Sequence, residues 1–139
     1  MTKKSFLPSM LPILAAILSI SLLLPAPASA LVTAFRQAIA EGVAEHEDMA
    51  EFYRERAFEP IWTRTEDAAR RNALLMALEG AANHGLPAGR YDPDALRAAF
   101  MDADNPYNRG QAEIMASAMF LRYAHDVQSG ILDPGAVVR

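Results

Sequence analysis

The segment of residues 109–129 constrains the fold more than any other part of this 139-residue chain. Helical spacing distributes its apolar side chains around nearly the whole circumference of a helix: Ile114, Met115, Ala118, Met119, Phe120, Leu121, Tyr123 and Val127. A helix that is apolar all round is buried on all sides in a folded protein. We therefore expect this helix to lie at the centre of an all-α domain, with shorter helices packed around it.

Four shorter segments show the same helical periodicity, and no alternation typical of strands persists for more than a few residues. Predicted helices cover residues 32–44 and 47–57, then a segment from an N-cap at Thr65 to Asn83-His84-Gly85, then one opened by Asp92-Pro93. These features predict a compact bundle of about five helices. The expected core comprises Phe52, Tyr53, Trp62, Leu78, Phe120, Leu121 and Tyr123.

The first 30 residues have the pattern of an export signal rather than of folded structure. Lys3 and Lys4 precede an apolar run over residues 11–24, and small residues at Ala28 and Ala30 predict cleavage after Ala30. An uncleaved membrane anchor is the alternative, but a bilayer span needs ~20 residues. We therefore predict a signal peptide at 1–30, a periplasmic protein and a mature domain at 31–139, which has no membrane contact once the signal is removed.

Charge and cysteine content narrow the function of the mature segment. Because Lys3 and Lys4 lie in the signal, 11 Lys and Arg face 17 Asp and Glu, a formal net charge of −6. An acidic chain without a basic stripe has no electrostatic attraction for nucleic acid. The chain contains no Cys, which excludes disulfides, thiolate catalysis and thiolate metal sites.

The three histidines do not form a recognisable catalytic or metal-binding motif. His46 lies in an acidic stretch, but a zincin motif needs a second His four residues on, and position 50 is Ala50. His84 suits the C-terminus of a helix, where a cation is favoured. His125 precedes Asp126, yet neighbouring residues on a helix do not face each other, and no nucleophile elbow accompanies them. We therefore assign no catalytic, cofactor-binding or metal-binding residue, and no cofactor.

Two further groups have a structural and a functional interpretation. Glu51, Glu55 and Glu59 recur every four residues and resemble paired carboxylates of a glycosidase, but a solvated helix face explains them better. A set of aromatic residues would suit a groove for a glycan or peptide, whereas core packing is the commoner role of such residues. This set comprises Phe52, Tyr53, Phe58 and Trp62.

Three segments, in this order, carry a family resemblance: residues 51–62 (EFYRERAFEPIW), 84–91 (HGLPAGRY) and 120–134 (FLRYAHDVQSGILDP). Together they resemble the N-terminal scaffold domain of the large murein L,D-transpeptidases. The resemblance implies a place in peptidoglycan cross-linking and cell-wall remodelling. In that family a separate domain carries the catalytic Cys and the His that activates it, so no catalytic residue is transferred to this chain.

The resemblance implies a non-catalytic helical scaffold whose partners are the remaining domains of an L,D-transpeptidase or another wall enzyme, and peptidoglycan is a further candidate. A second Asp-Pro pair, Asp133-Pro134, has the pattern of a helix start shortly before Arg139, and it predicts that the domain is truncated. A stand-alone periplasmic module that binds a wall enzyme or peptidoglycan is the main alternative. A wall hydrolase based on carboxylates is a third, without a convincing acid–base pair.

Overall fold

The computed structural model describes residues 28–131. These residues form five α-helices: α1 (Ala28–Gly42), α2 (Glu47–Glu55), α3 (Ala68–Glu79), α4 (Pro93–Met101) and α5 (Pro106–Ser129). Three 3-10 helices lie in the connections: η1 (Thr65–Asp67), η2 (Ala81–His84) and η3 (Ala88–Arg90). No strand occurs between residues 28 and 131, so the prediction of an all-α bundle is confirmed.

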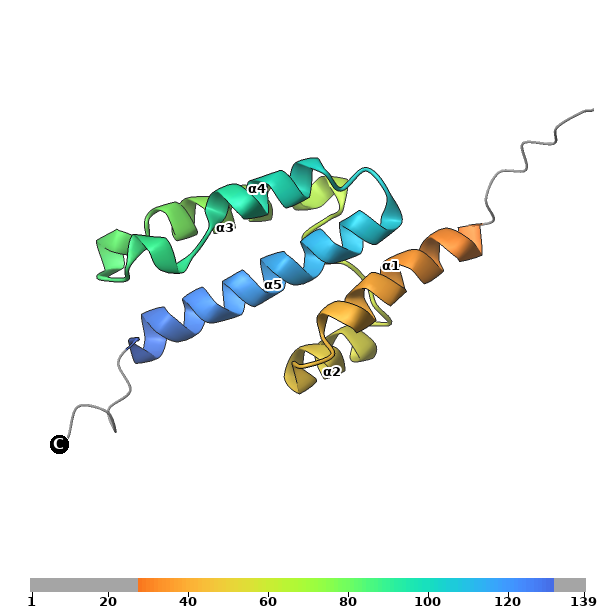
Figure 1. The fold of residues 1–139 in the computed structure, drawn as a ribbon, viewed down its shortest axis with the longest axis horizontal. Helices are drawn as coiled ribbons and strands as arrows, with labels where there is room; N and C mark the ends of the chain where they lie inside the picture. Colours follow the sequence, from red (N-terminus) through yellow and green to blue (C-terminus); the bar gives the residue numbers. More distant parts are fainter. Residues whose placement is uncertain (1–27, 132–139) are drawn as a thin grey trace, which may run out of the picture.

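The helix α5 is the axis of the bundle (Figure 1). α1 and α2 lie on one side of it, and α3 and α4 lie on the other. α4 runs antiparallel to α5, whereas α1 runs beside α5 in the same direction (Figure 1). The predicted central position of this segment is therefore confirmed, and the helix begins three residues earlier than expected, at Pro106.

α5 divides the apolar core into two clusters. Ala116 belongs to a cluster with residues of α3, α4 and their connections, and Ile114 belongs to a cluster with residues of α1 and α2. Two residues advance a helix by about 200°, so these two side chains point to opposite sides. The first cluster is Trp62, Leu74, Leu78, Ala81, Leu86, Tyr91, Leu96 and Ala116, and the second is Phe35, Ile39, Val43, Met49, Tyr53 and Ile114.

The predicted core is confirmed at Tyr53, Trp62 and Leu78, which are 0%, 4% and 1% exposed. Tyr123 is partly buried and packs against the first cluster. The prediction was wrong for three other residues, because Phe52, Phe120 and Leu121 are 41%, 45% and 49% exposed. The expectation that α5 is buried on all sides fails in its C-terminal half, where Val127 is also 48% exposed.

Helix starts follow the predicted chemistry in one case and depart from it in another. Asp92 accepts the backbone N–H of Ala95 at 2.8 Å, with Pro93 in the first turn, as predicted. Thr65 is not the N-cap that we expected, because it begins η1. Instead, the Asp67 carboxylate accepts the backbone N–H of Arg64 at 3.2 Å, and α3 begins after it.

Helix ends show how the chain changes direction. α2 ends at Glu55, two residues before the predicted end, because Ala57 and Phe58 both adopt left-handed backbone conformations, with φ of 54° and 63°. Non-glycine residues rarely take such angles, and each is strained. α3 ends at Glu79 and continues as η2, and Gly85 follows with the predicted left-handed φ of 73°.

No helix within residues 28–131 combines the length and the apolar composition that crossing a bilayer requires. The predicted signal peptide lies outside the described residues, apart from residues 28–30, which α1 includes. The Asp133-Pro134 pair also lies outside them.

The close contact between α1 and α5 depends on Gly110. A Cβ atom at this position would lie 2.6 Å from the Ala38 Cβ and 2.8 Å from the Phe35 carbonyl oxygen. We expect Gly110→Ala to lower the free energy of unfolding, because overpacking costs about 1–3 kcal/mol whereas the gain in helix propensity is at most ~1 kcal/mol. Urea denaturation measures this change.

Gly89→Ala is the matched control, because a Cβ atom there meets nothing within 4 Å. We expect its urea midpoint to equal or exceed that of the parent protein. A Gly110→Ala protein as stable as the parent would contradict the close approach of the two helices.

Candidate functional site

The three histidines lie on different segments of the chain, and all three are exposed. His46 precedes α2, His84 ends η2 with its ring centroid 6.3 Å from that of Tyr123, and His125 lies on α5. The His125 Nδ1 atom is 3.5 Å from the Asp126 carboxylate, so the expectation that these neighbours do not meet was wrong. Within residues 28–131, no three His, Asp or Glu side chains are placed to hold a metal ion.

The repeated carboxylates Glu51, Glu55 and Glu59 are exposed, as a solvated helix face predicts. Glu59 forms an ion pair with Arg64 at 3.0 Å, and both side chains are in contact with water. This geometry does not provide the buried acid and nearby base that glycoside hydrolysis requires.

A different carboxylate, that of Glu113, forms the main polar centre of the molecule. Glu113 is fully buried on α5. Its carboxylate accepts hydrogen bonds from the backbone N–H groups of Ile61, Trp62 and Thr63, at 2.6, 3.1 and 3.0 Å. It also accepts hydrogen bonds from the hydroxyls of Thr63 and Tyr53 at 2.9 and 3.0 Å. Every partner is a donor, which suits an acceptor-only carboxylate.

Ser117 extends this network one helical turn further along α5. Its Oγ accepts a hydrogen bond from Trp62 Nε1 at 2.8 Å and lies 2.7 Å from the Tyr53 hydroxyl. Because Tyr53 donates to Glu113, Ser117 donates to Tyr53, and the four residues form one ordered chain of donors. Burial, reinforced by the charge of Glu113, raises the pKa of Tyr53 and keeps its hydroxyl protonated. Ser117 is thus a structural hydroxyl rather than a nucleophile with a neighbouring base.

Asp126 is a second buried carboxylate, 2% exposed, near the end of α5. It accepts hydrogen bonds from Arg90 Nε and from Arg90 Nη2, the latter at 3.1 Å, and from the Tyr91 hydroxyl at 2.6 Å. These bonds, that from Arg90 first, lower the pKa of Asp126 well below its usual range, while burial raises the pKa of Tyr91. The result is a fixed connection between α5 and the segment before α4.

Sequence reasoning missed both carboxylates. Each is a single acidic residue in a largely apolar helix, and its partners lie far away in the sequence. A signal was nevertheless present for Asp126, because Tyr91 and Asp126 belong to two of the three segments that carried the family resemblance.

The exposed part of the predicted aromatic set lines a groove between α2 and α5. Tyr53 and Trp62 lie in the core, but Phe52 is exposed and faces the equally exposed Phe120 and Leu121 across a groove of about 280 Å³. We call it the α2–α5 groove, and its lining is Asp48, Met49, Phe52, Ile61, Ser117, Phe120 and Leu121. Large apolar side chains gathered at a surface typically mark a site of contact with a protein, a membrane or a ligand.

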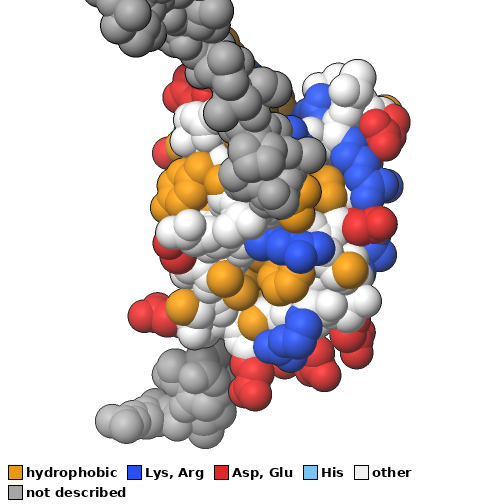
Figure 2. Space-filling model, turned by 90° about the vertical axis from the view of Figure 1, so that its right-hand side faces the viewer, with side chains coloured by type: hydrophobic (Ala, Val, Ile, Leu, Met, Phe, Trp, Pro, Cys, Tyr) orange, Lys and Arg blue, Asp and Glu red, His pale blue; other side chains and the backbone are white. Residues whose placement is uncertain are grey.

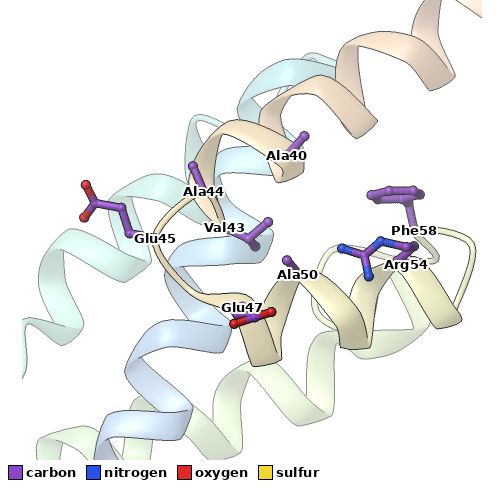
Figure 3. Close-up of a pocket in the computed structure, with 8 residues that line it drawn as sticks. All are labelled: Ala40, Val43, Ala44, Glu45, Glu47, Ala50, Arg54 and Phe58. Atoms are coloured by element: carbon purple, nitrogen blue, oxygen red, sulfur yellow. The ribbon is translucent and has the colours of Figure 1, made fainter.

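A wider cleft of about 660 Å³ lies between α1 and α2. Figure 3 shows Arg54 and Phe58 at one end of it and Glu47 at the other, with small side chains between them. Its lining comprises Ala40, Val43, Ala44, Glu45, Glu47, Ala50, Arg54 and Phe58. Because three of these residues are alanines and Val43 is buried, this cleft offers less apolar contact than the α2–α5 groove.

The surface charge is mixed. On the face drawn in Figure 2, arginine side chains are interspersed with acidic and hydrophobic ones, and they do not form a continuous stripe. That distribution agrees with the lack of a basic stripe in the sequence.

Comparison with known proteins identifies a family. The model of the family described as Scaffold domain matches residues 47–139, from the first residue of α2 onwards. No curated protein and no solved structure matches the chain significantly.

We expect Glu113→Gln to destabilise the protein by roughly 2–3 kcal/mol, because the amide NH₂ faces buried donors that then lack an acceptor. Thermal or urea unfolding measures this loss. Glu51→Gln, on an exposed carboxylate of α2, is the control and should unfold like the parent. Equal stability of the Glu113 variant and the control would contradict the network.

The lowered pKa of Asp126 predicts a specific acid dependence. The stabilisation that it provides is fully present above the pKa of Asp in the unfolded chain, about 3.9, and is lost as the pH falls through the lower pKa of the folded state. We expect Asp126→Asn to unfold at lower urea than the parent at pH 7, and this difference to shrink progressively below pH ~4.

Urea midpoints measured between pH 2 and pH 7 for both proteins test this dependence, with Asp102→Asn at an exposed position as control. A constant difference over the whole pH range would show that Asp126 does not contribute through its charge.

Proposed function

This chain belongs to the Scaffold domain family, and from that membership we propose that it is the helical scaffold of an L,D-transpeptidase-like protein that remodels peptidoglycan. The Scaffold domain is a non-catalytic domain type. In this proposal the chain provides a rigid surface on which another domain or a separate wall enzyme packs.

The use of the buried polar groups supports a scaffolding role. Glu113 and Asp126 are occupied by internal hydrogen bonds, and Ser117 accepts one from an indole. Glu51 and Glu55, which remain exposed on α2, lie one helical turn apart on its surface. A catalytic site would use buried polar groups of this kind for its chemistry. Here they form the hydrogen bonds that hold the connecting segments between helices in place.

The α2–α5 groove is the single observation that carries the proposal. Phe52, Phe120 and Leu121 keep nearly half of their surface exposed, although they lie close together. Covering such a cluster with a partner removes apolar surface from water, which contributes about 25 cal/mol per Å² of buried area to the free energy of binding. The groove is therefore the surface against which we expect a wall enzyme to pack.

The proposed location is the periplasm, reached through the predicted signal at residues 1–30. A stand-alone module that binds a separate wall enzyme uses the same groove and differs only in whether the partner belongs to the same polypeptide. Peptidoglycan itself is a further candidate ligand in that case.

Binding to a wall enzyme tests the proposal. We expect the full chain to bind the purified catalytic domain of an L,D-transpeptidase from the same bacterium in isothermal titration calorimetry. Leu121→Gln should weaken binding about tenfold or more, because it removes apolar contact worth ~1.4 kcal/mol or more. Val127→Gln is the matched control, since Val127 is equally exposed on α5 but lies outside the groove.

Cosedimentation with purified peptidoglycan sacculi distinguishes the two kinds of partner. Binding to sacculi that Leu121→Gln abolishes, with none to the enzyme, would favour the wall-binding module. Absence of both interactions would refute the proposed function.

A further inference from the structure

The α2–α5 groove continues at both ends into charged hollows. At one end it shares Asp48, Met49 and Leu121 with a hollow that also contains Glu45 and Glu47. At the other end it shares Ile61 and Phe120 with a hollow that contains three arginines. The three parts form one track with an acidic end, an apolar middle and a basic end.

The acidic end lies at the start of α2. Glu45, Glu47 and Asp48 are exposed, and none of the three forms an ion pair within the described part of the chain. Asp48 lines both the apolar groove and the acidic hollow, so it marks the boundary between them. A cation in this hollow is attracted by the carboxylates that line it.

The basic end follows α2. Arg56 lies with its guanidinium carbon 5.4 Å from the centre of the Phe52 ring, which joins the basic end directly to the apolar middle. Arg64 and Arg70 line the same hollow, although they are already paired with Glu59 and Asp67. Arg56 forms no ion pair among residues 28–131, so its charge is available to an anion.

We propose that this track binds a protein segment with a basic residue at one end, apolar residues in the middle and an acidic residue at the other end. The inference rests on the proposed function and describes the segment through which the partner is recognised. The charged ends find no counterpart on a neutral glycan, and ends of opposite sign do not fit a uniformly charged polymer. A peptide segment combines all three properties.

The spacing of the charges on the ligand follows from helix geometry. Asp48 lies in the first turn of α2 and Arg56 directly follows the helix, eight residues on, which corresponds to a rise of ~12 Å at 1.5 Å per residue. A helical ligand therefore needs its two charges about eight residues apart, and an extended ligand needs them about four residues apart. The apolar middle supplies most of the affinity, and the two charged ends fix the direction of binding.

Selection from a random peptide library displayed on phage tests this inference with the full chain as bait. We expect the enriched peptides to share an apolar centre between a basic and an acidic residue at one of these spacings. The most enriched peptide is then synthesised with a fluorophore, and its affinity is measured by polarisation. Leu121→Gln should weaken it ~tenfold, and Val127→Gln should leave it unchanged.

Charge exchange tests the acidic end of the track. Asp48→Lys should weaken the selected peptide several-fold, and a peptide whose basic residue is replaced by Glu should recover the loss. Glu51→Lys, the same kind of charge change on α2 but outside the track, is the matched control. Raised salt should diminish the effect of Asp48→Lys, because exposed charges are screened.

Several outcomes would overturn the inference. They are the recovery of no binders, enriched peptides without the charge order, equal effects of Asp48→Lys and Glu51→Lys, and competition by purified muropeptides at least as strong as that by the peptide. A wall enzyme that still binds through Leu121 in any of these cases would leave the proposed function intact and refute only the charge pattern.

Discussion

The carboxylate of Glu113 fixes the path of the chain between α2 and α3. Three successive backbone N–H groups, those of Ile61, Trp62 and Thr63, point at one side chain instead of at a helix or sheet. Buried backbone donors without partners are costly, so this segment can enter the core only because an acceptor is already there. Glu113 thereby allows Trp62 to fill the space between α3 and α5. It also explains how the strained residues Ala57 and Phe58 are tolerated just upstream, since the segment that follows them is held firmly.

Asp126 has the same role on the other side of α5, where it holds the segment that precedes α4. It holds Arg90 and Tyr91, and thus fixes the connection that leads into α4. α5 is therefore more than a helix around which others pack, because its two buried carboxylates each anchor a loop. Each of the three segments that carried the family resemblance contributes to these anchors, the first through Ile61 and Trp62, the second through Arg90 and Tyr91 and the third through Asp126, so these residues help to specify the internal architecture of the domain. That is the expected property of a scaffold.

Rules that depend only on residues close together in the sequence predicted much of the fold. The helical periodicity located all five α-helices of residues 28–131, and the cap at Asp92 and the left-handed Gly85 were correct, because each depends on neighbouring residues. Glu113 escaped prediction because its partners lie about 50 residues earlier, and nothing local distinguishes it from a solvated carboxylate. Periodicity also shows that a helix face is apolar without showing what covers it. For that reason Phe120 and Leu121 were assigned to the core, although one side of each remains exposed.

The buried network and the exposed groove share their walls. Tyr53 is bonded to Glu113 on the inner side of α2, while its neighbour Phe52 faces the groove, with the two rings 5.3 Å apart at nearly a right angle. Ile61 and Ser117 belong to the network and also line the groove. A surface whose walls are fixed from beneath loses little conformational entropy when a partner binds, and such preorganisation strengthens binding. In the proposed role, the buried polar groups contribute to recognition, because they hold the apolar side chains above them in one arrangement.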